Sequence, residues 1–301
     1  MKRQFKIVKI ANKLRIMRPY KKVMLSRSRA GNFGIFIFML AISAFMVLPL
    51  LYSVIQAFKP IDEIFAYPPR FFVNHPTVQN FKDAFTLAGN LWVPFSRYAF
   101  NSLLVSIGGT SLYVIVASLA AYPLAKGRFR GKATLSRLIV WTMMFSAEVL
   151  VIPRYIIISI FGMVDTYFAV ILPALSATMG VFLIRQFIDA SIPDSTLEAA
   201  RIDGANEYRI FGSIVMPSIK PAWLTVIIFT FQSLWNGNPQ SYIYSEQLKT
   251  LPTVMSTIAS GGIARSGASA AVAVIMMIPP IAVFIFTQSS VMETMAHSGL
   301  K

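Results

Sequence analysis

The chain has 301 residues, of which 55% are hydrophobic and only 13% are charged, and its mean hydropathy is +0.62. This composition excludes an ordinary soluble domain and predicts a membrane protein. The absence of cysteine excludes disulfides, thiolate metal sites and cysteine nucleophiles, and the two histidines, His75 and His297, cannot form a metal site alone.

Six long apolar segments follow one another along the chain. A helix that crosses the roughly 30 Å hydrocarbon layer needs about 20 mostly apolar residues. The segments lie at residues 33–58, 101–124, 138–161, 167–187, 222–235 with a few residues beyond, and 268–290. We therefore predict an all-α membrane protein with six transmembrane helices.

Positive charge predicts the orientation of these spans. The net charge is +16, and residues 1–30 hold many Lys and Arg residues but no acid. A second basic group follows the second span and consists of Lys126, Arg128, Arg130, Lys132 and Arg137. By the positive-inside rule both groups are cytoplasmic, and six spans then place the C-terminus in the cytoplasm too. We therefore attribute the net positive charge to the orientation of the spans in the membrane, and no nucleic acid is expected as a partner.

Two parts are predicted, a basic cytoplasmic arm at residues 1–30 and a six-span domain at residues 31–301. Apolar residues recur at helical spacing in the arm. It either rests on membrane lipid as a short helix or is an unstructured flank that only fixes topology. The first apolar run follows Gly31 and lacks a small-residue cleavage site, which predicts a span rather than a signal peptide.

The polar loop at residues 188–220 carries the most specific pattern. Its fixed positions are Glu198, Ala199, Ala200, Gly204, Ile214, Met216 and Pro217. They resemble the EAA motif of the membrane subunits of ATP-driven importers, which reads EAA, three residues, Gly, nine residues, Ile, any residue, Leu, Pro. Every spacing agrees, and Met216 in place of Leu is the one departure.

The same loop has the local signals of two short helices. Ser195 with Glu198 three residues later fits a capping box, which predicts a helix from Ser195 to Ile202. Gly204 would end that helix, because glycine readily takes the left-handed conformation. A second helix is expected from Asn206 to Pro217.

Further matches to the same family occur in order from Leu50 to Lys301. They include Asn101-Ser102-Leu103, Ile152-Pro153, Asp165-Thr166-Tyr167, Trp235-Asn236 and Thr250-Leu251-Pro252. The resemblance points to the carbohydrate-type permeases, the branch similar to the smaller membrane subunit of the maltose importer. It implies the type I importer fold, a bacterial inner-membrane location, and a sugar or oligosaccharide as solute.

In this family the EAA loop is the coupling helix, which docks on an ATP-binding subunit. The contact residues carried over by the resemblance are Glu198, Ala199, Ala200, Asp203 and Gly204. The alternative is that Glu198 only caps its own helix. The implied partners are a second, related permease in a heterodimer, two ATP-binding subunits and an extracytoplasmic solute-binding protein.

ATP and Mg²⁺ are expected on the partner subunit, and no cofactor is expected in this chain. Gly127, Gly131 and Lys132 approach a phosphate-binding loop, but the spacing is one residue short and Ala133 replaces the Ser or Thr that would hold Mg²⁺. No constellation of His, Cys or paired acids has catalytic spacing, so the chain is not expected to be an enzyme.

Two groups are candidates for a substrate pathway. Glu148 would lie roughly 15 Å deep if residues 138–161 formed one helix, and there it would bind solute or serve as a structural or protonated buried acid. Gln232, Trp235 and Asn236 share one helical face, which suits either a sugar ring or helix packing. The alternative function is a self-sufficient secondary transporter or channel that uses Glu148.

Overall fold

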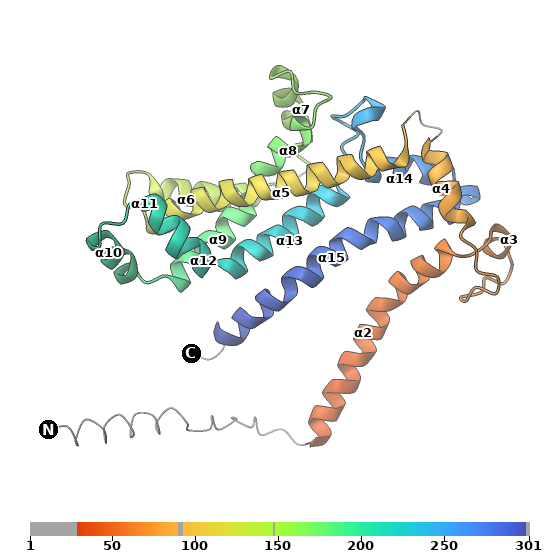
Figure 1. The fold of residues 1–301 in the computed structure, drawn as a ribbon, viewed down its shortest axis with the longest axis horizontal. Coiled ribbons are helices and arrows are strands. Elements are labelled where there is room, and N and C mark those ends of the chain that lie inside the picture. The colour runs from red at the N-terminus through yellow and green to blue at the C-terminus, as the bar shows by residue number, and fades with distance from the viewer. Residues whose placement is uncertain (1–28, 90–92, 147, 299–301) are drawn as a thin grey trace, which may run out of the picture. The chain divides into compact units, whose positions relative to one another are not determined.

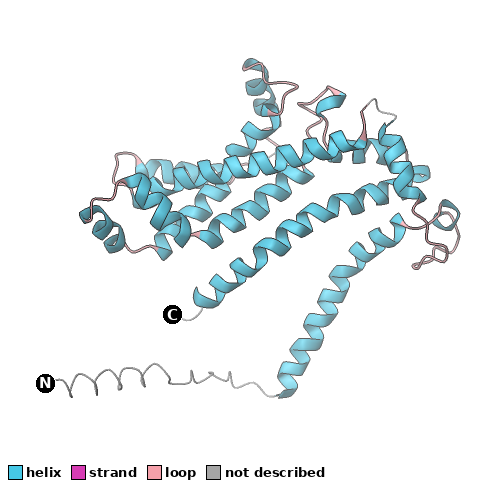
Figure 2. Ribbon diagram, in the orientation of Figure 1, coloured by secondary structure: helices cyan, strands magenta, loops and turns pink. Residues whose placement is uncertain are grey.

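The computed structural model describes residues 29–89, 93–146 and 148–298, with side chains for residues 30–288 of these ranges. Every regular element in the described residues is a helix (Figure 2). The chain divides into two compact units, residues 1–51 and 52–301. The predicted basic arm lies outside the described residues except for its last two.

Helix α2 (Arg29–Ala57) begins in the first unit and ends in the second. It contains the first predicted span, and apolar residues lie on all of its sides over residues 30–57. A helix that is apolar on all sides needs lipid or another protein around it.

The second unit is built around α5 (Phe95–Lys126), the long yellow helix in Figure 1. It packs against α8 (Phe168–Leu175), α9 (Thr178–Ser191) and α13 (Lys220–Asn236). Helix α15 (Ser266–Ser298) packs on α13, and α4 (Gln79–Gly89) and α14 (Leu251–Ala259) pack on α15.

Two buried clusters lie along α5. One surrounds Tyr113 and Ala121 and joins α5 to α9 and to residues 197–226. The other surrounds Tyr98 and joins the start of α5 to α4, α14 and α15. The remaining elements are α3 (Ile61–Ile64), α6 (Lys132–Thr142), α7 (Val151–Ile160), α10 (Asp194–Ile202), α11 (Glu207–Ile210), a π-helical turn (Phe211–Val215), α12 (Met216–Ser218) and two 3₁₀ turns (Glu246–Leu248, Ile263–Arg265).

Polar side chains fasten the first turns of α5 to the segment that precedes α14. The Asn101 amide donates to the carbonyls of Gln247 and Lys249 at 2.8 Å each, and its oxygen accepts from the Tyr167 hydroxyl at 2.7 Å. The Ser102 hydroxyl accepts from the backbone N–H of Leu251 at 2.8 Å. Asn101 is fully buried, so these bonds satisfy a side chain that would be costly to bury alone.

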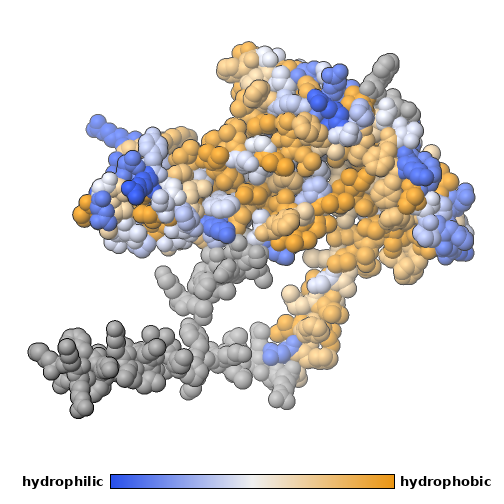
Figure 3. All heavy atoms as spheres, in the orientation of Figure 1, coloured by the Kyte–Doolittle hydropathy of each residue, from blue (hydrophilic) through white to orange (hydrophobic). Residues whose placement is uncertain are grey.

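Within the described ranges, four helices are long and apolar enough to cross a membrane: residues 30–57, 95–126, 168–191 and 263–288. A fifth is counted if residues 207–218 and 220–236, which are bent by 77°, form one span. The surface of the second unit agrees with this assignment. On the face in Figure 3, hydrophobic residues cover the middle of the helices, and hydrophilic residues gather near α10 and near α3.

The third predicted span is not one helix, which corrects the prediction for residues 138–161. Helix α6 ends at Thr142, turns follow, and α7 begins at Val151. Pro153 explains the restart, because it has no N–H to donate to the carbonyl of Val149 but is tolerated in the first turn of a helix. Arg154 then makes the first regular bond, to the carbonyl of Leu150 at 3.0 Å.

A close contact between α5 and α9 gives a prediction about stability. A Cβ on Gly180 would lie 2.4 Å from the Tyr113 hydroxyl, which itself accepts from the Gly180 N–H at 3.0 Å. We expect Gly180→Ala to destabilise the fold by about 1–3 kcal/mol, because the ring cannot move without losing that bond. A Cβ on Gly109 would come too close only to Cδ1 of Leu234, the end of a flexible side chain at 2.6 Å, so Gly109→Ala is the matched control.

Thermal unfolding of the detergent-solubilised protein measures both effects. Gly180→Ala should lower the midpoint by more than Gly109→Ala does. Equal shifts would contradict the close packing of the Tyr113 ring on Gly180.

Candidate functional site

The loop at residues 188–220 connects α9 to α13 and contains two short helical segments. Helix α10 begins at Asp194, directly after Pro193, whose extended backbone precedes the helix. The predicted capping box does not form, because Ser195 already lies inside the first turn and no side chain caps the helix. Asp194 places negative charge in this first turn, which the helix dipole favours.

Gly204 ends α10 as the sequence predicts. Its φ is +82°, its N–H donates to the carbonyl of Arg201 at 3.0 Å, and the N–H of Ala205 donates to the carbonyl of Ala200 at 3.0 Å. These two bonds are those of the Schellman motif, which closes a helix through a residue in the left-handed region. Most residues with a side chain are strained there, so the motif favours glycine for a reason of backbone geometry.

The second segment starts at the predicted place and then changes its winding. Asn206 caps α11 by accepting from the N–H of Arg209 at 2.8 Å. A π-helical turn over Phe211–Val215 follows, then α12, and the chain bends by 77° into α13. The indole N–H of Trp223 donates to the carbonyl of Met216 at 3.1 Å and so connects the two sides of the bend.

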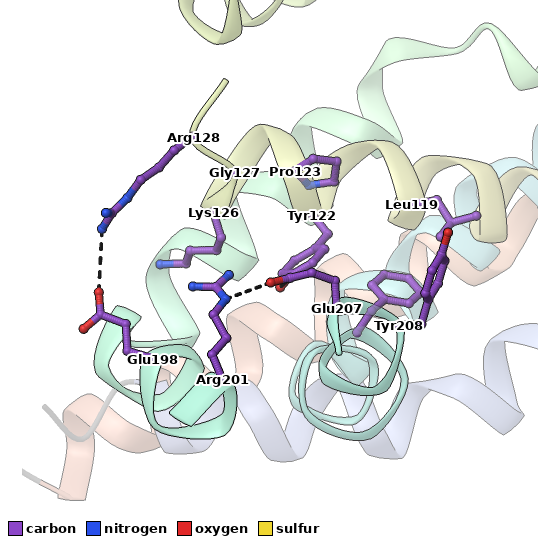
Figure 4. A pocket seen from close by; sticks show the side chains of 11 residues that line it. Leu119, Tyr122, Pro123, Lys126, Gly127, Arg128, Glu198, Arg201, Glu207 and Tyr208 are labelled. Carbon is purple, nitrogen blue, oxygen red and sulfur yellow. Dashed lines mark hydrogen bonds and ion pairs between the residues drawn. The ribbon is translucent and has the colours of Figure 1, made fainter. Parts of the chain in front are cut away.

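The loop is fastened to the end of α5 by charged and polar contacts (Figure 4). Lys126 binds Asp194 at 2.8 Å, and the Tyr122 hydroxyl donates to Glu207 at 2.6 Å. Glu207 also binds Arg201 at 2.7 Å, which joins α10 to α11. The hydrogen bond from Lys126 holds the pKa of Asp194 below its usual value, so this carboxylate stays charged at neutral pH.

An open pocket of about 590 Å³ lies between α5 and this loop, and Figure 4 shows the residues around it. Glu198 lies at its edge, 3.6 Å from Arg128, and both side chains are largely exposed. An exposed pair at that distance contributes little to stability. Glu198 is therefore free to exchange this partner for another, and it does not cap its own helix.

The loop exposes two large residues that the sequence analysis did not identify, one on α10 and the other, Tyr208, in the wall of the pocket beside α5. Ile202 and Tyr208 are 86% and 85% exposed. Ala199, Asp203 and Gly204 are also exposed, whereas Ala200 is half-buried against the cluster around Tyr113. The exposure of Ile202 could have been predicted from its position five residues after the buried Leu197. Five residues at 100° each place the two side chains on well-separated faces of a helix.

The structure does not bring the other candidate residues together. Glu148 is exposed in the turn between α6 and α7, so its depth cannot be counted along one helix. Trp235 is buried, donates its indole N–H to the carbonyl of Met276 in α15 at 2.8 Å, and stacks on Phe231. Gln232 and Asn236 are exposed, so they occupy a different surface from Trp235.

Residues 113–296, more than half of the chain, match the family described as the inner membrane component of binding-protein-dependent transport systems. The chain belongs to this family. It is therefore a permease subunit of a transport system and not an enzyme. In such systems ATP binds to a partner subunit, and a solute-binding protein delivers the solute. The family excludes the alternative of a self-sufficient secondary transporter.

Individual relatives agree over most of their length. The permease is 30% identical to an arabinooligosaccharides transport system permease protein of Halalkalibacterium halodurans, over 85% of this chain and 91% of the relative. It is 31% identical to an sn-glycerol-3-phosphate transport system permease protein of Yersinia enterocolitica, over 83% and 91%.

A solved structure has the same fold. It is the crystal structure of a bacterial ABC transporter involved in the import of the acidic polysaccharide alginate, with a TM-score of 0.72 and 22% identity. The match covers 87% of the permease and 98% of the matched chain. The helical architecture around α5 is thus an ABC transporter fold.

Proposed function

We propose that this permease is one half of a heterodimeric pathway for a sugar or oligosaccharide, and that its 188–220 loop is the coupling element. The loop would dock on one of two ATP-binding subunits in the cytoplasm. A solute-binding protein would deliver the solute from the opposite side. Closure of the ATP-binding dimer would then move the loop and open the pathway outward.

Two features of the loop support the coupling role: its exposed apolar surface and its ion pair to α5. Ile202 exposes apolar surface on α10, the helix that also presents the small residue Ala199. Exposed apolar side chains among polar neighbours are typical of a protein interface. The ion pair between Lys126 and Asp194 fastens the same loop to α5, so a partner that moves the loop also moves a transmembrane helix.

Six spans with both termini in the cytoplasm remain our proposal for the topology. Helices α2, α5, α8–α9, α13 and α15 would supply five of them. The segment from α6 through α7 would supply the third as a broken span. Backbone that is not helical is tolerated at membrane depth where it is buried in protein or lines a water-filled cavity. The second permease would supply the surroundings that this segment needs.

The proposed solute class comes from the relatives, whose names include arabinooligosaccharides and sn-glycerol-3-phosphate. One of these solutes is a neutral saccharide and the other carries a phosphate. The proposed class therefore includes both neutral and anionic solutes.

A single-cysteine experiment tests the coupling role, because the natural chain has no cysteine to remove. We expect Ala199→Cys, in cells that contain the whole transport system, to form a cross-link with an ATP-binding subunit that mass spectrometry identifies. Tyr67→Cys is the matched control, since Tyr67 is 95% exposed in the loop between α3 and α4 and should not cross-link to that subunit. A cross-link from Tyr67 but not from Ala199 would refute the proposed docking.

A further inference from the structure

An open pocket of about 810 Å³ lies beside α8, away from the coupling loop. Its wall is formed by the end of α6 and the turn after it, by the start of α7, by α8 and the start of α9, and by the end of α13 with the residues that follow. The residues that matter for its chemistry are Phe145, Arg154, Thr178, Ser233, Asn238 and Tyr242.

Arg154 is the one charged side chain among the residues that line this pocket. It is half-buried, and within the described residues no carboxylate lies close enough to form an ion pair with it. A guanidinium keeps its charge at every physiological pH and has five N–H donors. Such a group in a recessed wall favours an anion in the pocket.

The acidic residues of the neighbouring segments do not supply that anion. Glu148 lies in the turn before α7 but does not line the pocket. Asp165 accepts from the N–H groups of Tyr244 and Ser245 at 2.9 and 2.8 Å, so its charge is directed to the loop after α13. Among the described residues, the pocket therefore contains one uncompensated positive charge.

The rest of the wall suits a molecule with hydroxyl groups. Thr178 and Ser233 make no side-chain hydrogen bond within the described residues, so both hydroxyls are free to donate and accept. Tyr242 stacks on Tyr155 with ring centroids 6.4 Å apart, which fixes an aromatic ring in the wall. An aromatic ring with nearby hydroxyls is a common surface for a sugar ring.

We infer that this pocket contacts the solute during transport and that Arg154 selects a solute with a carboxylate or phosphate group. The inference rests on the proposed function and makes its solute class more specific. An anionic saccharide would place its acid on Arg154 through a charge-assisted hydrogen bond and its hydroxyls on Thr178 and Ser233.

The test measures ATP-dependent uptake by membrane vesicles that contain the complete transport system with its solute-binding protein. The probes are an oligouronate trimer, glycerol 3-phosphate and a neutral oligosaccharide trimer, which separate carboxylate, phosphate and uncharged solutes. We expect the wild-type system to import one of the two anionic probes. Arg154→Gln should reduce that uptake by about tenfold or more, and Arg154→Lys should retain most of it.

Arg265→Gln is the matched control, because Arg265 lines a different pocket, beside α4, and should leave uptake unchanged. Preference for the neutral trimer, or equal uptake by wild type and Arg154→Gln, would overturn the inference. Loss of the second permease on purification of Arg154→Gln would also overturn it, since the arginine would then belong to the subunit interface. Uptake of none of the three probes would contradict the solute class in the proposed function itself.

Discussion

Replacement of Gly204 by proline is expected to abolish uptake while the permease remains in the membrane. Proline fixes φ near −65°, whereas Gly204 has a φ of +82°. Proline also removes the N–H that donates to the carbonyl of Arg201. Both changes break the turn that sets the direction of α11 relative to α10. The spans do not depend on this turn, so insertion should be normal, and uptake by vesicles should fall to background.

Gly204→Asn is the control for this change. Asparagine tolerates the left-handed region better than other residues with side chains and keeps the N–H. We expect it to retain a substantial part of the uptake. Normal uptake by Gly204→Pro would show that the turn between α10 and α11 is not needed for coupling.

Ile202→Asp is expected to weaken the binding of the ATP-binding subunit by about thirtyfold or more. This figure corresponds to the roughly 2 kcal/mol that separates central interface residues from peripheral ones. Ile202 is 86% exposed and makes no contact that the fold needs, so the substitution should act on docking and not on stability. Co-purification of the ATP-binding subunit with the tagged permease, titrated against subunit concentration, measures the loss.

Ile263→Asp is the matched control, because Ile263 is also well exposed, at 70%, but lies between α14 and α15. It should leave the binding of the ATP-binding subunit unchanged. Ile202→Leu should behave like the wild type, since it keeps the apolar surface. Equal binding by Ile202→Asp and wild type would remove this residue from the interface.

The long helices could be predicted because their apolar length alone requires a membrane. The break between Thr142 and Val151 could not, since the residues around it are as apolar as a span and hydropathy does not detect a turn. Pro153 was the one local signal, and its effect depends on whether it lies inside a helix or in its first turn. Glu148 was misplaced for the same reason.

The candidate site shows a similar division. Gly204 was predicted correctly because the requirement for a left-handed residue is local. The contact of Lys126 with Asp194 was not predicted, because the two are 68 residues apart and meet only after α5 and α10 have packed. The burial of Trp235 depends in the same way on α15, which supplies the carbonyl that accepts its indole N–H.

One helix is bonded at both of its ends to loops. Near its last turn α5 contacts the coupling loop through Tyr122 and Lys126, and near its first turn it contacts the segment before α14 through Asn101. Its 32 residues span about 48 Å. A stiff helix of this length transmits a small displacement of one end to the other end. We therefore expect the two faces of the permease to respond in one concerted step.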